Sequence, residues 1–320
     1  MLHSFNRLLQ KMMPFITPVS VILGVVFAGW LESFQYLVPW IFAFMTFAGS
    51  LGSNFTDVRH VIKHPVPLLI CLVLLHLIMP IISLGVGNVF FSDDPYLITG
   101  LILAFIIPTG ITSLIWVSIY RGNVVLTLSI ILLDTLLSPL LVPLILQAFV
   151  GNSIQMDGWE IMTGLFWMVV IPSLLGMSLN QFTKGRVKVT VEPKLAPFAK
   201  LAIIGVISIN SSGVASYFRN ISLELILVAL VVFIIAVSGY FLGWLTASVL
   251  KQSRANIISL TFNSGMRNIS AGAVIAITYF PDAAALPVIV GMLFQQVIAS
   301  TTGGLLDRMY RNKGEGSVIV

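Results

Sequence analysis

The sequence predicts an all-α integral membrane protein, and both its composition and its apolar runs support that fold class. Of the 320 residues, 58% are hydrophobic and only 9% are charged, whereas a soluble domain has roughly 45–50% apolar and about 25% charged residues. Apolar stretches close to the ~20 residues that cross a bilayer recur from Ile16 to Leu306. A soluble globule is excluded, because the chain has too little polar surface to coat one.

Ten transmembrane helices are predicted in order along the chain. The first five cover residues 14–30, 37–51, 66–90, 96–120 and 124–149, and the second five cover 159–179, 196–212, 223–250, 256–279 and 285–306. Arg7 and Lys11 precede the first run, but no small-residue cleavage site follows it, so a helix is predicted there rather than a signal peptide. We expect one five-helix repeat over residues 1–150, a second over 151–308, and a cytoplasmic tail over 309–320.

The charges of the loops predict the orientation, because cytoplasmic loops hold most Lys and Arg residues. All but two of the 17 basic residues fall in the terminal segments and in alternate loops, namely Arg7, Lys11, Arg59, Lys63, Arg121, Lys184, Arg186, Lys188, Lys194, Lys200, Lys251, Arg254, Arg308, Arg311 and Lys313. The opposite loops hold Glu32, Asp93, Asp94, Asp157, Glu160, Glu224, Asp282 and one base, Arg219. A multi-pass plasma-membrane protein with both termini cytoplasmic is predicted. The bases form no patch interleaved with aromatic residues, so nucleic acid is excluded as a partner and membrane lipid is expected.

Two of the predicted helices are interrupted, and they occupy the same place in the two halves. With five helices per half, two repeats must be inverted relative to each other. The fourth helix is interrupted by Pro-Thr-Gly at 108–110, and the ninth by polar residues and glycine at 263–268. Such paired interruptions point to a transporter's binding site, because exposed backbone groups are tolerated in a bilayer only where they face a cavity or a ligand. Alternatively, Pro108 merely kinks a helix and Gly265 merely permits close packing.

Two charged residues lie inside predicted helices, Asp134 in the fifth and Arg267 in the ninth. Each costs at least ~2.5 kcal/mol if it faces lipid at the helix centre, so each is expected to face protein or a water-filled cavity. Asp134 shares one helix face with Thr127, Ile131 and Ser138. We hypothesise that Asp134 and Arg267 face each other and neutralise each other or share a substrate anion. A structural ion pair with no part in transport is the alternative.

Other polar residues inside the predicted helices do not form an enzyme's constellation. Aspartyl hydrolysis needs two facing carboxylates, and Asp134 is alone; a serine protease needs a base, and His76 is the only candidate. His76 is either a hydrogen-bonded core residue or a proton carrier. Further polar side chains line a cavity or join helices by hydrogen bonds, namely Asn210, Ser211, Ser212, Gln295 and Gln296. The chain is not predicted to be an enzyme; a channel or an intramembrane sensor is the alternative to a transporter.

Three short motifs carry a resemblance to a known family. Arg-Gly-Asn-Val at 121–124 is followed by Ser-Pro-Leu-Leu-Val-Pro at 138–143, and the ninth helix contains Asn-Ser-Gly-Met-Arg-Asn at 263–268. These stretches resemble helices of the bile acid:sodium symporter family, and the helix count, orientation and both breaks agree with it. The resemblance implies a panel domain of helices one, two, six and seven and a core domain of the others. It also implies transport of organic anions such as bile acids, pantoate or pyruvate, generally with sodium, by an elevator-like motion.

The sodium ligands that the resemblance implies are largely replaced in this sequence. The positions of the first site read Ser113, Leu114, Thr127, Ile131 and Asn263, and those of the second read Leu75, Asn263 and Arg267. Only Ser113, Thr127 and Asn263 remain as a degenerate sodium site. Sodium needs several oxygen ligands with some negative charge, and a guanidinium at the same place is expected to exclude it electrostatically.

The predicted function is therefore transport of a small organic anion by alternating access, with Arg267 acting as a tethered cation. Such a protein is a facilitator or is proton-coupled through Asp134, and an ordinary sodium symporter is the alternative, so Na⁺ or H⁺ is the candidate coupling ion and no cofactor is expected. The predicted substrate and ion site consists of Thr109, Thr112, Ser113, Thr127, Asp134, Asn263, Ser264, Arg267 and Asn268.

Overall fold

The computed structural model describes residues 2–53, 65–220 and 222–311, and the described chain is built from helices. The first half contains α1 (Leu2–Val26), α2 (Ala28–Leu31), the 3₁₀ helix η1 (Glu32–Leu37), α3 (Val38–Ser50), α5 (Pro65–Val73), the π-helical turn η2 (Leu74–Ile78), α6 (Met79–Phe90), α7 (Pro95–Ile106), α8 (Thr112–Ile119) and α9 (Val124–Val150). The second half contains α10 (Gly158–Leu165), the π-helical turn η3 (Phe166–Val170), α11 (Ile171–Phe182), α12 (Arg186–Thr190), α13 (Glu192–Gly213), α14 (Ala215–Arg219), α15 (Leu223–Val249), α16 (Arg254–Gly265), α17 (Ile269–Tyr279) and α18 (Asp282–Arg311).

Six continuous helical runs of the described chain are long and apolar enough to cross a membrane. They are Pro65–Phe90, Val124–Val150, Gly158–Phe182, Glu192–Gly213, Leu223–Val249 and Asp282–Tyr310, and a seventh results if Phe15–Val26 and Ala28–Ser50, which are bent by 85°, are counted as one. The chain is thus an all-helical, multi-pass membrane protein. α1 begins at Leu2, well before the predicted start at residue 14, so the segment that precedes the first predicted span is also helical.

Side-chain caps explain where several of the long helices begin. Asp94 accepts hydrogen bonds from the backbone N–H groups of Tyr96 and Leu97 at the start of α7, and Asp157 does the same at the start of α10. Asn123 caps α9 through Leu126. These side chains satisfy amides that lack a partner in the first turn, and the two carboxylates also oppose the positive end of the helix dipole.

Two prolines explain the two π-helical turns. Pro80 and Pro172 each occupy the second position of the helix that follows, where a proline cannot donate and its ring crowds the preceding turn. The chain widens instead: the N–H of Met79 donates to the carbonyl oxygen of Leu74, five residues back. His76 lies in the middle of the first widened turn. Widened turns of this kind are frequent at functional sites.

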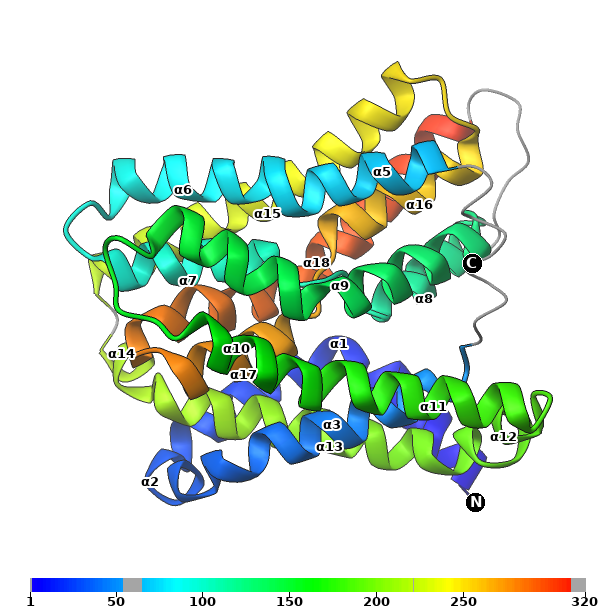
Figure 1. Cartoon of the computed structure of the whole chain (residues 1–320), viewed down its shortest axis with the longest axis horizontal. Helices are drawn as coiled ribbons and strands as arrows, with labels where there is room; N and C mark the ends of the chain where they lie inside the picture. The colour runs from blue at the N-terminus through cyan, green and yellow to red at the C-terminus, as the bar shows by residue number, and fades with distance from the viewer. Residues whose placement is uncertain (1, 54–64, 221, 312–320) are drawn as a thin grey trace.

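The helices form two packed groups (Figure 1). Helices α1, α3, α11 and α13 pack against one another in the lower layer, whereas α5, α6, α15 and α16 lie above them. The lower group packs closely: Ser208 Oγ donates to the carbonyl oxygen of Ser20 over 3.0 Å, and a Cβ on Gly24 would lie 2.4 Å from the carbonyl oxygen of Ser208. Helices α7 and α17, one from each pair of broken helices, lie between these two groups.

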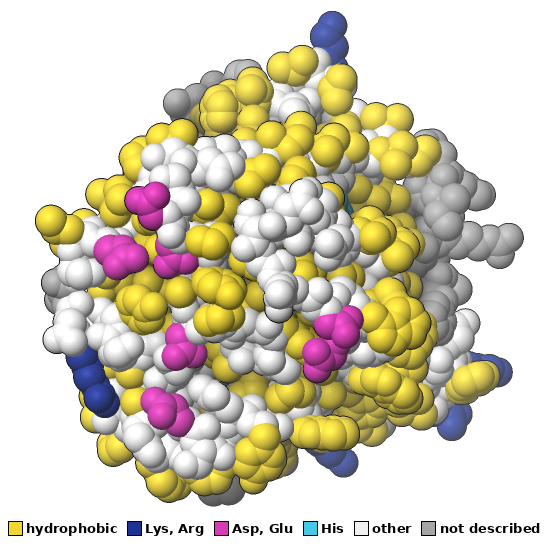
Figure 2. Space-filling model, turned by 60° about the vertical axis from the view of Figure 1, so that its left-hand side comes forward, with side chains coloured by type: hydrophobic (Ala, Val, Ile, Leu, Met, Phe, Trp, Pro, Cys, Tyr) yellow, Lys and Arg dark blue, Asp and Glu magenta, His cyan; other side chains and the backbone are white. Residues whose placement is uncertain are grey.

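The two sets of loops lie at opposite ends of the molecule (Figure 1). The α6–α7 and α9–α10 connections are at the left-hand end, and the α11–α12 and α15–α16 connections are at the right, together with the start of α1 and the end of α18. Figure 2 shows acidic side chains gathered on the left-hand face. Burial raises the pKa of Tyr217 on α14, and the negative charges of Asp94, Glu224 and Asp282 raise it further, so three acidic connections converge there. Three of the bases used to predict the orientation, Arg59, Lys63 and Lys313, lie outside the described residues.

Candidate functional site

The two interrupted helices are broken where the sequence predicted, and the breaks touch. α7 ends at Ile106 and α8 begins at Thr112; α16 ends at Gly265 and α17 begins at Ile269. The backbone N–H of Asn268 donates to the carbonyl oxygen of Pro108 over 2.8 Å. The chain thus brings two pairs of helix ends to one crossing in the interior.

Local chemistry explains both breaks. The ring of Pro108 disfavours helical backbone at the residue before it, and Ile107 is extended, with ψ 147°. The helix α16 ends at Gly265, whose missing side chain is required by packing: a Cβ there would lie 2.3 Å from the ring of Tyr240. Met266 then continues in extended conformation. The alternative interpretation was that Pro108 only kinks a helix and that Gly265 only permits close packing. In the structure α16 ends at Gly265, and α7 ends at Ile106, two residues before Pro108.

Arg267 binds the carbonyl ends of both broken helices. The residue is 2% exposed. Its Nε donates to the carbonyl oxygen of Phe105 over 2.9 Å, and its Nη1 donates to those of Ser264 and Met266 over 2.7 and 3.2 Å. Phe105 and Ser264 lie in the last turns of α7 and α16, where unsatisfied carbonyls carry the negative end of the helix dipole. The guanidinium is therefore stabilised by backbone oxygens.

Asp134 on α9 binds the backbone of the first break, between α7 and α8. Its side chain is fully buried, and Oδ2 accepts a hydrogen bond from the backbone N–H of Thr109 over 2.7 Å. Oδ1 lies 2.5 Å from Nε2 of His76, with which it forms an ion pair when the imidazole is protonated. The carboxylate thus joins the first break to the widened turn η2.

The direct pairing of Asp134 with Arg267 that we hypothesised is not formed. Among the described residues, Asp134 pairs with His76, and Arg267 is hydrogen-bonded to carbonyl oxygens. The two charges lie within electrostatic reach of each other without contact. The sequence did carry a signal for the true partner: a buried carboxylate needs a basic or donor group, and His76 was a second basic side chain, besides Arg267, deep within a predicted helix.

Asn263 is the centre of the predicted degenerate sodium site. Its Nδ2 donates to the carbonyl oxygen of Ser259 over 2.8 Å and to Thr127 Oγ1 over 3.0 Å. Because a carbonyl oxygen only accepts, this contact fixes which end of the amide is nitrogen. On the other side, Oδ1 accepts from Ser113 Oγ over 3.1 Å and from Thr109 Oγ1 over 3.5 Å. The structure brings Ser113, Thr127 and Asn263 together.

The residues at both expected sodium positions do not fit a sodium ion. At the first, the amide nitrogen of Asn263 donates to the oxygens that an ion would need as ligands. At the second, Leu75 is fully buried in an apolar cluster with Cys71, Leu126 and Ile130, and Arg267 supplies a cation already. An N–H donor and a guanidinium both oppose a second positive charge.

Two small cavities open on the crossing, each of about 120 Å³. Ile111 and Asn268 line both; Thr112, Arg267 and Ser270 line the first, and Thr109 and Thr135 line the second. Ile111 and Asn268 are also the residues before the first turns of α8 and α17, and neither makes a side-chain capping hydrogen bond. Uncapped helix N-termini offer backbone N–H groups and a positive dipole to an anion.

The remaining polar residues divide into two groups. Gln295 and Gln296 line the first cavity, where Gln295 Oε1 accepts from the backbone N–H of Arg267 over 3.0 Å and Gln296 Oε1 accepts from Trp116 Nε1 over 3.2 Å. Asn210, by contrast, is fully buried in α13, and within the described chain its amide has no hydrogen-bond partner. The glutamines thus belong to the crossing.

Comparison with known proteins identifies the family. The profile of the sodium bile acid symporter family matches residues 39–221. The chain belongs to this family. Its relatives include the uncharacterized protein YbaS of Bacillus subtilis, which is 52% identical over 92% of this chain and 97% of its own length.

More distant relatives of the chain are named as transporters. The uncharacterized sodium-dependent transporter YocS of Bacillus subtilis is 24% identical over 97% of both chains. The probable sodium/metabolite cotransporter BASS1, chloroplastic, of Arabidopsis thaliana is 26% identical over 87% of this chain and 69% of its own length. Family membership makes the chain a transporter rather than an enzyme.

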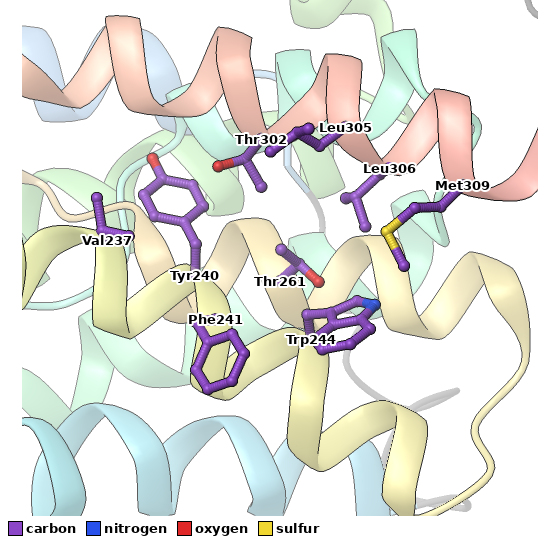
Figure 3. Close-up of a pocket in the computed structure, with 9 residues that line it drawn as sticks. All are labelled: Val237, Tyr240, Phe241, Trp244, Thr261, Thr302, Leu305, Leu306 and Met309. Atoms are coloured by element: carbon purple, nitrogen blue, oxygen red, sulfur yellow. The ribbon is translucent and has the colours of Figure 1, made fainter.

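A larger cavity of about 280 Å³ lies between α15, α16 and α18 (Figure 3). Its lining is mostly apolar, and four of the lining side chains are exposed on the surface, namely Val237, Phe241, Leu305 and Met309. Thr261 and Thr302 supply hydroxyl groups there, but no charged side chain lines the space. It does not offer the chemistry that binds an organic anion.

Proposed function

We propose that this chain carries a small organic anion across the plasma membrane by alternating access, with Arg267 in place of a bound cation. The observation that carries the proposal is the crossing itself. The carbonyl ends of α7 and α16 bind a guanidinium, while the N-terminal ends of α8 and α17 open uncapped on cavities. Cation and anion sites at opposite ends of broken helices are typical of secondary transporters.

The proposal includes ten membrane spans in two inverted repeats, over residues 1–150 and 151–308. Each broken pair, α7 with α8 and α16 with α17, counts as one span, and α1 and α3 count as two more. These four spans are added to the six continuous ones. An even number agrees with the start of α1 and the end of α18 lying at the same end of the molecule in Figure 1. The basic loops at that end favour a cytoplasmic location for both termini.

The substrate is a small carboxylate of the pantoate or keto-acid kind, with a bile acid as the larger alternative. Two cavities of about 120 Å³, both lined by Ile111, favour a short molecule. Its carboxylate is stabilised by the amides and dipoles at the starts of α8 and α17 and by the charge of Arg267.

Transport is independent of sodium in this proposal, either as facilitated movement or with a proton. The amide of Asn263 and the guanidinium of Arg267 support this, since both oppose a bound cation. Ordinary sodium symport is the second candidate, and the printed names of relatives such as the sodium-dependent transporter YocS favour it.

The test is uptake of labelled pantoate, pyruvate and taurocholate into proteoliposomes, with sodium and pH gradients imposed separately. We expect saturable uptake that unlabelled substrate inside accelerates, and that is equal in sodium and potassium buffers; a channel shows no such acceleration. A requirement for a sodium gradient would establish the second candidate instead. Arg267→Gln is expected to reduce uptake at least tenfold, on the order of 1.4 kcal/mol of binding, and Arg308→Gln, at the exposed end of α18, serves as the control. Unchanged transport and ion dependence in Arg267→Gln would overturn the tethered cation.

A further inference from the structure

We propose that His76 and Asp134 form a proton-binding site, in which His76 takes up and releases the proton that travels with the substrate and Asp134 is its fixed counter-ion. The inference rests on the proposed function and names the coupling ion. His76 lies on η2 and is 8% exposed at its side chain, whereas Asp134 lies on α9 and is 0% exposed. Ionisable groups buried at membrane depth are costly and are found at ion pathways.

The hydrogen bonds at this site determine where the proton goes. Nε2 of the neutral imidazole donates to Asp134 Oδ1 over 2.5 Å, which leaves Nδ1 as the acceptor nitrogen. That Nδ1 is buried and, within the described chain, has no hydrogen-bond partner. A hydronium ion that delivers its proton to Nδ1 leaves a neutral water molecule; the new N–H bond converts the ring to imidazolium, while Nε2 continues to donate to the carboxylate. The charge of the pair changes from −1 to 0, and the unpartnered nitrogen is the vacant proton position.

The surroundings keep Asp134 in place in both protonation states. The backbone N–H of Thr109 only donates, so it holds Oδ2 whether His76 is neutral or charged. The other ionisable groups that face Asp134 in the described chain are Cys71 on α5, whose Sγ contacts Ser264 Oγ, and Arg267, which is held by carbonyl oxygens. In the described chain His76 is the side chain that forms the ion pair with Asp134, and we therefore place the exchanged proton on His76.

The same pair is joined to the proposed substrate site. Thr109, whose amide binds Asp134, lines the cavity beside the start of α8. With His76 neutral, the charges of Asp134 and Arg267 cancel; with His76 protonated, the crossing carries one net positive charge. An anion binds the second state better, and by linkage the anion strengthens proton binding by the same factor. A carboxylate and a proton therefore cross together.

The experiment measures exchange and accumulation separately in proteoliposomes, with labelled pantoate and pyruvate as probes, valinomycin with equal potassium on both sides, and protein-free vesicles as the blank. Exchange of labelled for unlabelled anion needs no net proton movement, whereas accumulation driven by an acidic exterior does. For one proton per anion, a gradient of one pH unit gives about tenfold accumulation in the wild type. His76→Gln keeps a side-chain donor for Asp134 and cannot be protonated. It is expected to exchange the anion at a higher half-saturating concentration, because the uncharged pair binds an anion less well, and to lose the accumulation.

The outcomes separate the two proposals. Failure of the wild type to exchange either probe contradicts the proposed function. Exchange without pH-driven accumulation, or equal accumulation in His76→Gln, overturns the proton site alone. Cys71→Ser is the control for a neighbouring ionisable group and should behave as the wild type. If His76→Gln does not fold, a pH-sensitive dye inside wild-type vesicles decides: each anion that enters must bring one proton, and entry without acidification overturns the proposal.

Discussion

Both helix breaks have unpaired backbone groups that a buried charged side chain binds, and the two charges are opposite. At the first, between α7 and α8, a backbone N–H group is held by a carboxylate that another helix supplies, Asp134 on α9. At the second, between α16 and α17, the guanidinium of Arg267 belongs to the break itself and reaches back to Ser264 and across to Phe105. Broken helices in a bilayer must satisfy both donors and acceptors. The chain uses a built-in anion for the donor and a built-in cation for the acceptors.

The comparison predicts the largest loss of stability when the cation is removed. Arg267→Met keeps much of the side-chain length and leaves the carbonyl oxygens of Phe105, Ser264 and Met266 without this donor. At roughly 1–3 kcal/mol for each buried group left unsatisfied, we expect a loss of about 4 kcal/mol. Thermal unfolding of the purified protein in detergent, beside Arg308→Met, measures it. An unchanged melting temperature would mean that these carbonyls need no cation.

A smaller loss is expected when the carboxylate is removed from the first break. Asp134→Leu leaves the amide of Thr109 and Nε2 of His76 unpartnered, and about 3 kcal/mol should be lost. Asp134→Asn retains an acceptor for Thr109 and a donor toward His76, so it should lose about 1 kcal/mol. The same thermal measurement compares the two variants. Equal losses from both would show that charge, rather than hydrogen bonding, holds the first break.

A loss smaller than those of Arg267→Met and Asp134→Leu is expected where the two breaks touch. A Cβ on Gly110 would lie 2.8 Å from the backbone carbonyl oxygen of Arg267, so Gly110→Ala must push the breaks apart. We expect a loss of about 1–2 kcal/mol, together with reduced uptake. Gly205→Ala is the matched control, because nothing lies within 4 Å of its added Cβ in α13 and a helical alanine gains up to ~1 kcal/mol. Similar melting temperatures for both variants would show that the breaks do not constrain each other.

The all-helical character of the described chain and its long apolar helices were predictable from the sequence, because apolar length is a local property. Pro108 and Gly265 marked both helix ends for reasons of backbone chemistry that the structure bears out. The partner of Asp134 was not predictable. His76 lies 58 residues away and is presented by a turn that Pro80 widens, so its direction depends on a departure from regular helical spacing.

The hydrogen bonds of Arg267 were missed for a related reason. The sequence indicates that a buried guanidinium needs partners, and the nearest intramembrane carboxylate was the natural choice. Backbone carbonyl oxygens carry no sequence signature, and they become available only because both helices end beside this residue. The clustering of Ser113, Thr127 and Asn263, in contrast, followed from the resemblance and is present.

In the proposed transport cycle, the arginine at the crossing also determines how the carrier responds to voltage. A sodium ion enters and leaves with its substrate, whereas the guanidinium of Arg267, bonded to the backbone of two helices, stays with the protein in both directions. A monovalent anion that crosses without a companion therefore moves its full charge, and an inside-negative potential of 100 mV opposes its entry by about 2.3 kcal/mol and favours its exit equally. One proton on His76 cancels that charge. In the proposed cycle, protonation of His76 thus decides whether the membrane potential drives export of the anion or does not act on its transport.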